Sequence, residues 1–390
     1  MNIALIRQEQ TKGDGGAQAI IDIILQVLVK EDDINVSLLC RKWESAQTIS
    51  NDSTQAASTK KVIINPGYQS RQAKQESFNQ AVREYLQQHH FDLIQSHERL
   101  NGCHIFRAGD GVHKVWLQKK LSISNWLQRW WLLRSSYHKA LIHEEKQMFE
   151  NQSLKKVICN SHMTKQEITN HFSIDKEKVI VIYNGVDTQL YKPVNQDTKA
   201  TLRQSLNIPG NALVFMFSGS GFERKNLSTT IKAFSQLSGN CYLIVVGRDK
   251  KLASYKRLAK RNHCHDRVIF LGAQERSNMP SIYQMADVLV LPTLYDPFPN
   301  AILEALSSGL PCITSTTCGA IDIIPKHHCG SIVAAKDEGA LIKAMNRYQE
   351  KELLARESIN ATTTAQQFTK EIMQKKLLQL YSDVLGKNHA

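Results

Sequence analysis

Short apolar runs alternate with segments of helical periodicity along the first half of this chain of 390 residues. A buried strand is predicted over 2–7. A helix is predicted over 17–29, where Ile20, Ile24 and Val27 fall on one helical stripe. Further strands are predicted over 36–40, 62–64, 93–95, 157–160 and 179–183. Strands that alternate with helices favour parallel pairing in a doubly wound sheet.

The same alternation begins again after a polar stretch over 192–199, which is typical of a linker between domains. Strands are predicted over 212–218, 242–246, 268–271, 288–291, 312–315 and 331–333, and helices over 227–237 and 301–308. The tail over 352–385 is predicted to be helical, with an interruption near 362–364. We predict an α/β protein with one Rossmann-like domain over 1–190 and a second over 191–370. A C-terminal helix over 371–390 is predicted to pack back on the first domain.

Composition narrows the class of protein. Hydrophobic residues make up 42% and charged residues 22%, which is typical of a soluble globular chain. No apolar run is long enough to cross a bilayer, and the first residues predict a strand in place of a secretory leader. The net charge of +13 favours anionic partners such as nucleic acid, phosphorylated lipid or a membrane surface.

The cysteine pattern predicts buried, reduced thiols in a cytosolic protein, because 8 cysteines are scattered without a C-x-x-C pair. His263-Cys264-His265 and His327-His328-Cys329 contain residue types that bind metals. Neighbouring residues on a chain rarely point at one ion, so we interpret both as solvated loops.

Gly13-Asp14-Gly15-Gly16 separates the first predicted strand from its helix. Ligands of open α/β sheets bind at the carboxyl ends of strands, and glycine lets the backbone approach them closely. The loop would then hold a phosphate or shape an acceptor pocket, with the helix N–H groups beside it. The alternative is a tight turn. The spacing is not G-x-G-x-x-G, which argues against a dinucleotide site.

A second loop, Gly219 to Asn226, follows the strand over 212–218 and carries two adjacent cations. Arg224 offers a fork of donors and Lys225 a point charge, which suits a pyrophosphate. Both would offset the negative charge that grows on a departing diphosphate. A solvated basic turn is the alternative, but the position at a strand end favours a binding role.

The segment Asp296 to Pro311 places two acids eight positions apart after the strand over 288–291. Its loop leads into a short helix, whose first N–H groups near Asn300 and Ala301 would face phosphate oxygens. Asp296 and Glu304 would each accept hydrogen bonds from hydroxyls of one nucleotide-sugar. Two exposed surface acids are the alternative.

This segment resembles the E-x7-E motif of the retaining GT-B glycosyltransferases of family 4, with Asp296 first and Glu304 second. The residues over 223–225 resemble the cationic diphosphate loop of that family, and those over 184–187 its domain junction. The stretch over 106–113 is similar to a segment of glycosyltransferases of lipopolysaccharide core assembly. The resemblance covers most of the chain and is strongest over 179–325.

The resemblance implies a GT-B fold, with two Rossmann-like domains facing each other across a cleft. It implies transfer of a hexose or N-acetylhexosamine from a donor, UDP-linked or similar, to a lipopolysaccharide or lipooligosaccharide core hydroxyl, with retained configuration. Glu304 would bind the ribose, Asp296 the transferred sugar, and Arg224 and Lys225 the diphosphate. The remaining donor-site positions that it implies are Gly15, Gly16, Ser220, Gly247, Arg248, Leu271, Phe298, Pro299, Asn300 and Ala301.

The chain departs from the family pattern in several positions. The first acid is Asp, one methylene shorter than Glu, so its sugar contact is expected to shift. Many relatives carry Gly-Arg where this chain has Gly219-Ser220, and often Glu where it has Asp322. No D-x-D occurs, so we expect neither a metal nor a cofactor.

Asp110 and His113 lie in a glycine-flanked loop that follows the turn Asn101-Gly102. Either side chain is of a type that accepts a proton from an acceptor hydroxyl. A turn stabilised by an Asx hydrogen bond is the alternative. The resemblance favours a catalytic role that faces the acceptor, without choosing between the two.

Four of the 5 tryptophans cluster between Trp116 and Trp131, interleaved with basic residues from Lys119 to Lys139. Such a segment on an amphipathic helix suits a bilayer headgroup region or an anionic lipid-linked acceptor. A helix that buries its tryptophans in the core remains the alternative. With the resemblance, we expect a cytoplasmic protein held peripherally at the inner membrane. No nucleic-acid-binding signature is present.

Two other functions stay open. A nucleotide-sugar epimerase of GT-B fold would need neither an acceptor nor a tryptophan-rich surface. A non-catalytic binder of anionic glycolipid would tolerate the loss of Asp296 and Glu304.

Overall fold

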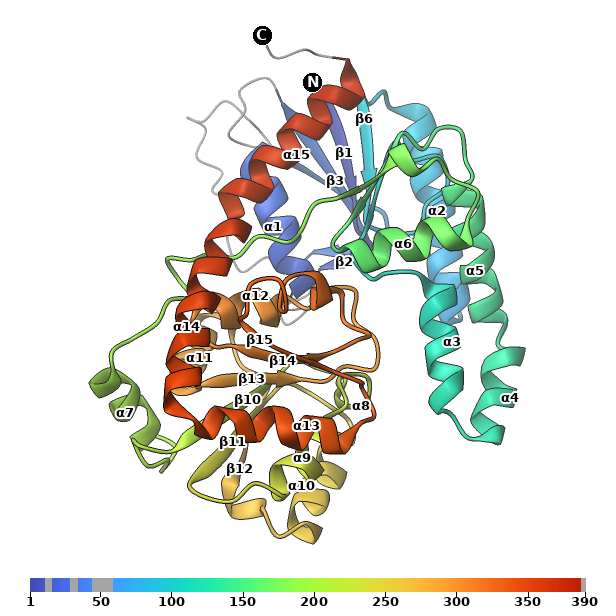
Figure 1. The fold of residues 1–390 in the computed structure, drawn as a ribbon. Coiled ribbons are helices and arrows are strands. Elements are labelled where there is room, and N and C mark those ends of the chain that lie inside the picture. The colour runs from blue at the N-terminus through green and yellow to red at the C-terminus, as the bar shows by residue number, and fades with distance from the viewer. Residues whose placement is uncertain (11–15, 29–33, 44–58, 387–390) are drawn as a thin grey trace. The chain divides into compact units, whose positions relative to one another are not determined.

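The chain divides into two units, each built around one parallel β-sheet with helices beside it (Figure 1). The computed structural model describes residues 1–10, 16–28, 34–43 and 59–386. Unit 1 comprises Met1–Tyr183 and the segment from Met373 onward, and unit 2 comprises Asn184–Ile372. The division therefore falls before the predicted 190/191 boundary.

The sheet of unit 1 has the strand order β5-β3-β1-β6-β7-β8-β9, so the order reverses beside β1. Its strands are β1 (Asn2–Ile6), β3 (Asn35–Cys40), β5 (Thr59–Ile63), β6 (Leu93–Ser96), β7 (Ile105–Ala108), β8 (Lys156–Cys159) and β9 (Val179–Val181). A separate pair is formed by β2 (Glu9–Gln10) and β4 (Lys42–Trp43). The helices are α1 (Gly16–Leu28), α2 (Arg71–Gln88), α3 (His113–Ile123), α4 (Trp126–Arg134), α5 (Ser136–Phe149), α6 (His162–His171) and α15 (Lys370–Leu385).

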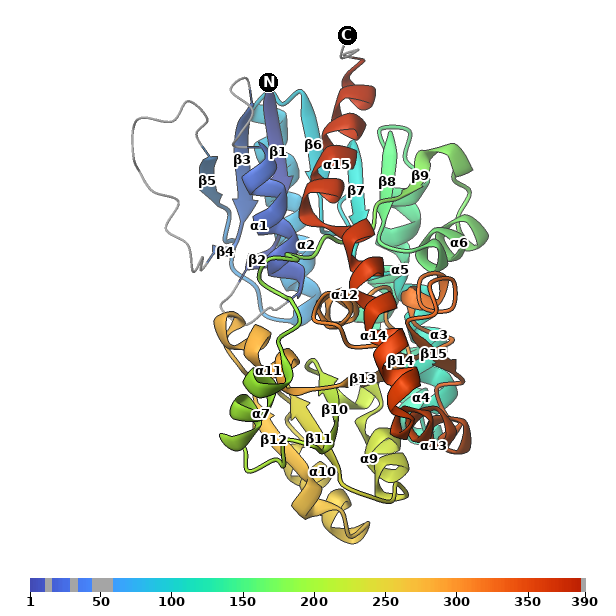
Figure 2. The same cartoon turned by 60° about the vertical axis from the view of Figure 1, so that its left-hand side comes forward.

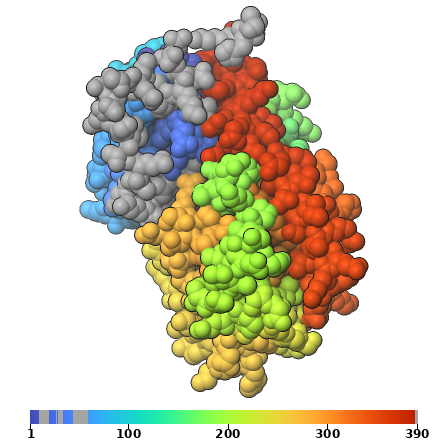
Figure 3. Space-filling model, turned by 90° about the vertical axis from the view of Figure 1, so that its left-hand side faces the viewer, coloured from blue at the N-terminus to red at the C-terminus, as the bar shows by residue number. Residues whose placement is uncertain are grey.

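The core of unit 1 lies between the sheet and the helices α1 and α15. Ile21 of α1 is fully buried with Ile3 of β1 in one hydrophobic cluster, to which α15 adds Leu377 and Tyr381. The Tyr381 hydroxyl donates to Gln95 Oε1 at 2.7 Å, which satisfies a polar side chain in this core. Figure 2 shows α15 alongside unit 1, and its outer face is exposed there (Figure 3).

The sheet of unit 2 has the order β12-β11-β10-β13-β14-β15, with the reversal beside β10. Its strands are β10 (Leu213–Ser218), β11 (Cys241–Val246), β12 (Val268–Gly272), β13 (Val288–Leu291), β14 (Cys312–Ser315) and β15 (Gly330–Val333). Its helices are α7 (Gln196–Gln204), α8 (Phe222–Lys225), α9 (Leu227–Ser235), α10 (Leu252–Arg261), α11 (Met279–Met285), α12 (Asn300–Ser307), α13 (Glu338–Asn346) and α14 (Lys351–Ala365). Ligands of such sheets bind where the strand order reverses, at the carboxyl ends.

The segment that resembles a domain junction pairs with the stretch before α15. Val186 N donates to Phe368 O at 2.9 Å, and Lys370 N donates to Val186 O at 3.1 Å. A Cβ on Gly185 would lie 2.7 Å from the Lys370 Cα, so only glycine fits there. Asp187 accepts from Lys370 Nζ at 2.6 Å. The two passages of the chain are thus fastened to each other.

The secondary structure differs from the sequence prediction in three places. The interruption of the tail falls after α14, because the hydroxyls of Thr362 and Thr364 donate to carbonyls of the preceding turn and the helix continues through them. The strand β7 was not predicted, since Arg107 breaks its short apolar run. The tryptophan-rich segment is not one helix: it forms α3, α4 and α5. Within the described residues, no helix is long and apolar enough to cross a membrane.

Candidate active site

Two glycines lie at strand ends of unit 2, where the backbone passes close to Lys225. Gly219 follows β10 with a φ of +124°, and a Cβ there would collide with the side chain of Lys225. Gly247 follows β11 with a φ of +135°, and a Cβ there would collide with the backbone of Gly219. Side chains rarely adopt such φ values, so close approach and conformation both require glycine. Lys225 can therefore lie across Gly219 at the reversal point.

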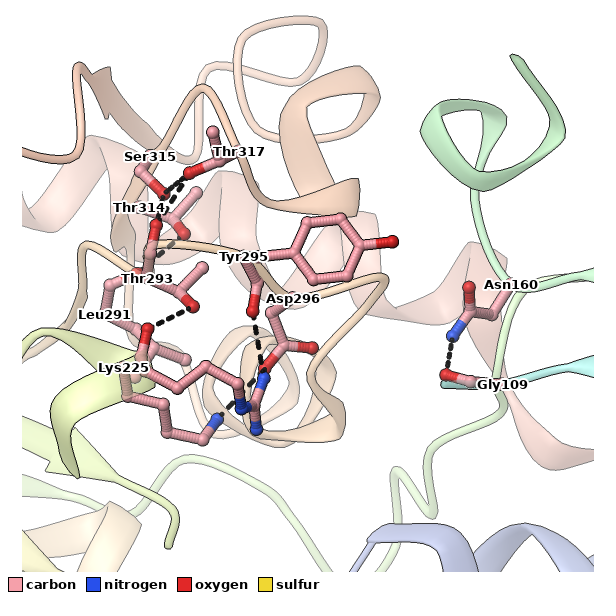
Figure 4. Close-up of polar contacts among 11 residues, drawn as sticks. Gly109, Asn160, Lys225, Leu291, Thr293, Tyr295, Asp296, Thr314, Ser315 and Thr317 are labelled. Atoms are coloured by element: carbon pink, nitrogen blue, oxygen red, sulfur yellow. Dashed lines mark hydrogen bonds and ion pairs between the residues drawn. The ribbon is translucent and has the colours of Figure 1, made fainter. Parts of the chain in front are cut away.

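The two cations of α8 converge on Asp296 (Figure 4). Asp296 Oδ2 accepts from Arg224 Nη1 at 2.7 Å and from Lys225 Nζ at 3.3 Å. Asp296 is only 6% exposed, which excludes the alternative of an exposed surface acid. Burial opposes its charge, but Lys225 and Arg224 outweigh burial and lower the pKa of Asp296 below its usual value. In this state Asp296 compensates both cations.

Hydroxyl groups from two strand ends fix the backbone of this cluster (Figure 4). Thr293 Oγ1 donates to Arg224 O at 3.1 Å, and Leu294 N donates to the same carbonyl at 2.8 Å. The hydroxyls of Ser315 and Thr317 both donate to Thr293 O. Because these bonds join α8 to the loops after β13 and β14, the cations are held by main chain as well as by Asp296.

Glu304 projects from α12 against a buried phenol. Tyr283 Oη donates to Glu304 Oε2 at 2.8 Å and lies 3.4 Å from Ser218 Oγ, the last side chain of β10. Burial raises the pKa of Glu304, opposed by the hydrogen bond from Tyr283 and by the charge of Arg276. A carboxylate held in this way can accept hydrogen bonds from ligand hydroxyls.

The remaining donor-site predictions of unit 2 lie in β12, in α12 and in the loops after β10, β11 and β13. Ser220 Oγ accepts from Arg248 N at 3.2 Å, and Gly247 N donates to Gly272 O at 2.8 Å, so the loops after β10, β11 and β12 are linked. The N-cap of α12 is Pro299, and Asn300 begins the helix. Asn300 Oδ1 accepts from Asn184 Nδ2 at 2.6 Å. Of the three other predicted positions, Leu271 lies in β12, Phe298 lies between β13 and α12, and Ala301 lies in α12.

In unit 1, the loop after β7 is anchored by a buried acid. Glu145, 1% exposed, accepts from His113 N at 2.6 Å and from Arg99 Nε at 2.8 Å. Asn160 Nδ2 donates to Gly109 O at 3.1 Å, as Figure 4 also shows. The loop is thus fixed on both sides of Asp110, which is exposed.

His113 is poorly suited to accept a proton. Its Nε2 lies 3.0 Å from His138 Nδ1, and its ring stacks on Trp116 with centroids 5.3 Å apart. Burial, followed by the charge of Arg99, lowers the pKa of His113 to about 3. The imidazole is therefore neutral and weakly basic near pH 7. Of the two acceptor-side candidates, Asp110 presents an exposed carboxylate, whereas the ring of His113 is held by His138 and Trp116.

The predicted phosphate loop is only partly visible. Gly15 lies outside the described residues, while Gly16 is the first residue of α1. Their proposed contact with phosphates stays a prediction.

The tryptophan-rich segment does not bury most of its rings. Trp126, Trp130 and Trp131 of α4 are 75%, 44% and 66% exposed, which excludes the core interpretation for these three. Trp116 of α3 is partly buried. Exposed aromatic rings at this density are uncommon on a solvated surface.

All eight cysteines are free and buried, as the sequence predicted. His263 and His265 are exposed while Cys264 between them is buried, so the three do not face one point. Among the residues that the structure describes, no group of three or more His, Cys, Asp or Glu side chains could hold a metal ion.

Sequence reasoning missed four residues of the site: Ser218, Tyr283, Thr293 and Glu145. Ser218 could have been found, because it ends the strand before the cationic loop. Tyr283 and Thr293 carry no local signal, since their partners lie elsewhere in the chain.

Two family models match the chain, Glycosyltransferase Family 4 over residues 14–190 and Glycosyl transferases group 1 over residues 198–365. Together with the two parallel Rossmann-like sheets, these matches identify the chain as a glycosyltransferase with the GT-B fold. More specifically, the chain is a glycosyltransferase of the group 1, family 4 type.

Two curated relatives illustrate the match. An Escherichia coli UDP-Gal:alpha-D-GlcNAc-diphosphoundecaprenol alpha-1,3-galactosyltransferase is 27% identical over 55% of this chain and 56% of its own length. The lipopolysaccharide glucosyltransferase WaaG of Escherichia coli K12 is 24% identical over 65% of this chain and 66% of its own. The chain thus spans between about half and two thirds of these curated relatives.

Solved structures extend the likeness in fold over nearly the whole chain. A crystal structure of WaaG has a TM-score of 0.82 at 19% identity and covers 97% of this chain and 99% of that one. Anabaena HepE in complex with UDP-glucose has a TM-score of 0.73 at 17% identity, covering 98% and 100%.

Proposed function

We propose that the chain transfers a hexose or N-acetylhexosamine from a UDP-linked sugar to a hydroxyl of a lipopolysaccharide or lipooligosaccharide core, with retained configuration. The proposed binding of the donor rests on one observation: Arg224 and Lys225 both contact Asp296 at the strand ends of unit 2. HepE, of similar fold, has been solved with UDP-glucose, which supports a UDP-linked donor.

In the proposed reaction, unit 2 binds the donor. Glu304 accepts from the ribose hydroxyls, while Arg224, Lys225 and the first N–H groups of α12 contact the diphosphate. As the bond to the sugar breaks, negative charge grows on the diphosphate, and these preorganised donors stabilise it. The second oxygen of Asp296 is available to a sugar hydroxyl. Since the protein's cations supply the charge compensation, the proposal requires no metal and no cofactor.

The acceptor is assigned to unit 1. Asp110 orients the attacking hydroxyl, and the resemblance to WaaG, named for lipopolysaccharide, supports the core oligosaccharide as acceptor. No residue of α4 is buried, and the helix exposes Trp126, Trp130 and Trp131 together with Arg129 and Arg134, a combination of aromatic and basic side chains that suits an anionic bilayer surface. We therefore place the protein peripherally at the cytoplasmic face of the inner membrane.

The donor assignment is tested by calorimetry with UDP, GDP and ADP, followed by transfer assays of the matching sugars with mass spectrometry of the acceptor. We expect UDP to bind, and Glu304→Ala to weaken it by at least tenfold. The anomeric configuration of the product is read by NMR. A folded protein that binds no nucleotide would overturn the proposal. An altered sugar after incubation with donor alone would indicate an epimerase, and full activity of Asp296→Ala and Glu304→Ala would indicate a different site.

The membrane assignment is tested by sedimentation with vesicles of neutral lipid alone or with anionic lipid added. We expect binding to the anionic vesicles only, and its loss when Trp126, Trp130 and Trp131 are all replaced by Ala. The control is Ile359→Ala, which removes an exposed apolar side chain from α14. Equal sedimentation of the triple variant and wild type would refute a role for α4.

A further inference from the structure

We propose that Tyr283 is a positioning residue that makes the donor site select ribonucleotides, because its buried hydroxyl holds the Glu304 carboxylate in one orientation. This inference rests on the proposed function, in which Glu304 binds the ribose. It adds a residue from another helix, α11, and it names the chemical feature of the donor that this residue controls.

The phenol of Tyr283 has little freedom to move. The residue is 0% exposed, and its ring meets the ring of Tyr191 edge-on, with centroids 5.6 Å apart and an interplanar angle of 82°. The hydroxyl oxygen lies 3.4 Å from Ser218 Oγ on one side and 2.8 Å from Glu304 Oε2 on the other. Full burial and these contacts restrict movement of the ring. The hydroxyl is therefore a fixed donor.

Tyr283 occupies only one oxygen of Glu304. Within the described part of the chain, no hydrogen bond reaches Oε1, and Glu304 is partly exposed. The charge of Arg276 also favours the charged form of Glu304. The second oxygen is thus oriented and open to a ligand while the first is satisfied by protein.

The fixed orientation has a chemical consequence. Burial raises the pKa of Tyr283 well above its usual value, so the phenol keeps its proton and stays a donor. The ionised carboxylate can only accept hydrogen bonds, and a vicinal diol supplies two donors. A deoxyribose leaves the partly buried carboxylate without these donors. Sites built to bond a hydroxyl reject analogues that lack it.

The experiment compares Tyr283→Phe with a matched control, Tyr348→Phe. Tyr348 is also buried, at 1% exposed, and its hydroxyl donates to a glutamate, Glu357 Oε2, at 2.6 Å. Glu357 lies on α14, away from the strand ends. Calorimetry measures the Kd of UDP and of 2′,3′-dideoxy-UDP for both variants, for wild type and for Glu304→Gln.

For Tyr283→Phe we expect UDP to bind about tenfold more weakly, the change that 1.4 kcal/mol produces, with little change for the dideoxy analogue. The preference for UDP should be retained in Tyr348→Phe and lost in Glu304→Gln. If Tyr283→Phe keeps the full preference while Glu304→Gln loses it, the inference is wrong and the proposed function survives. If Glu304→Gln keeps the preference as well, the ribose assignment itself fails.

A double variant covers the case in which Tyr283→Phe is too unstable to purify. In Tyr283→Phe with Glu304→Gln, a neutral amide replaces the buried charge, so the loss of its partner costs less. If Tyr283 acts only through Glu304, the double variant should bind both nucleotides as Glu304→Gln alone does. A further loss of UDP affinity in the double variant would overturn the inference.

Discussion

Replacing Asp296 by Asn tests whether this carboxylate balances the charges of Arg224 and Lys225 when no nucleotide is bound. The change keeps the shape of the side chain and removes its charge, so Arg224 and Lys225 lose their common counter-charge. We expect the ligand-free protein to become less stable and UDP to bind more tightly, because the phosphates no longer compete with a carboxylate. Transfer should nevertheless slow, since the contact of Asp296 with the sugar is lost.

The size of the effect follows from burial. Breaking a buried ion pair costs about 3–5 kcal/mol. The side chain of Lys225 is 8% exposed, but that of Arg224 is 39% exposed and partly screened by water. We therefore take the lower end, about 3 kcal/mol, which corresponds to a Tm lowered by roughly 6–12 °C for a domain of this size. UDP affinity should rise about tenfold, a change of 1.4 kcal/mol.

The pH dependence of stability tests the role of Asp296 independently, because the direction of its pKa shift predicts how stability changes with pH. The pKa of Asp296 is lowered in the folded protein, so its stabilising contribution is present above the unfolded pKa of about 4. That contribution is lost as the pH falls through the folded value. The difference in unfolding free energy between wild type and Asp296→Asn should therefore be largest near neutral pH and shrink on acidification.

Asp287, which precedes β13 at the opposite end of that strand from Asp296, provides a matched control. Asp287 accepts from Arg203 at 2.7 Å and from Lys199 at 2.9 Å, but it precedes β13, whereas Asp296 follows it. Asp287→Asn should destabilise unit 2 comparably, and UDP should raise its Tm by no more than it raises that of wild type. Differential scanning calorimetry with and without UDP measures both variants. Equal responses to UDP in the two variants would refute the counter-charge role of Asp296.

Three further predictions concern Glu304, Gly185 and Asp110. Glu304→Gln should raise the Tm of the ligand-free protein, because burial raises the pKa of this carboxyl and its charge costs stability above the unfolded pKa; a lowered Tm would contradict this. Gly185→Ala should destabilise by about 1–3 kcal/mol in denaturant titrations, since its Cβ would meet the Lys370 backbone. Asp110→Asn should lower kcat without changing UDP affinity, and the pH–rate profile should show no step from His113 between pH 5 and 8.

The strands of unit 2 could be predicted from sequence because they are buried on both faces. Fully buried parallel strands are continuous apolar runs, and the run at β13 was predicted with the observed bounds. The loops after these strands could then be placed at the carboxyl ends of the strands. This placement predicted that Arg224, Lys225 and Asp296 lie at the same end of the sheet. Their contact within hydrogen-bonding distance was not predictable, because it depends on how Lys225 crosses Gly219.

Other parts could not be predicted because tertiary contacts decide them. β7 holds four residues with an arginine inside, and it is a strand because β6 and β8 pair with it on both sides. The breaks between α3, α4 and α5 lie at polar residues that cap the following helix, such as Asn125 and Ser135. Ser, Thr and Asn also occur inside helices, as at Thr364, so the residue types alone do not locate a break.

The charges of Asp296 and Glu304 have opposite effects on the stability of the ligand-free protein, and this difference follows from the residues that each acid contacts. Asp296 has two cations within 3.3 Å and a lowered pKa, so its charge stabilises the fold. Glu304 accepts a hydrogen bond from a phenol, and burial raises its pKa despite the charges of Arg276 and Lys225, so its charge is held at a cost. A ligand hydroxyl that bonds to Glu304 relieves this cost, whereas one that bonds to Asp296 must share it with Arg224 and Lys225. We therefore expect the ribose to contribute more to donor affinity than the transferred sugar does. Comparing UDP with 2′,3′-dideoxy-UDP measures the contribution of the ribose hydroxyls, and comparing UDP-sugars with UDP measures that of the sugar. Tighter binding of UDP-sugars by more than tenfold over UDP would show that this ordering is wrong.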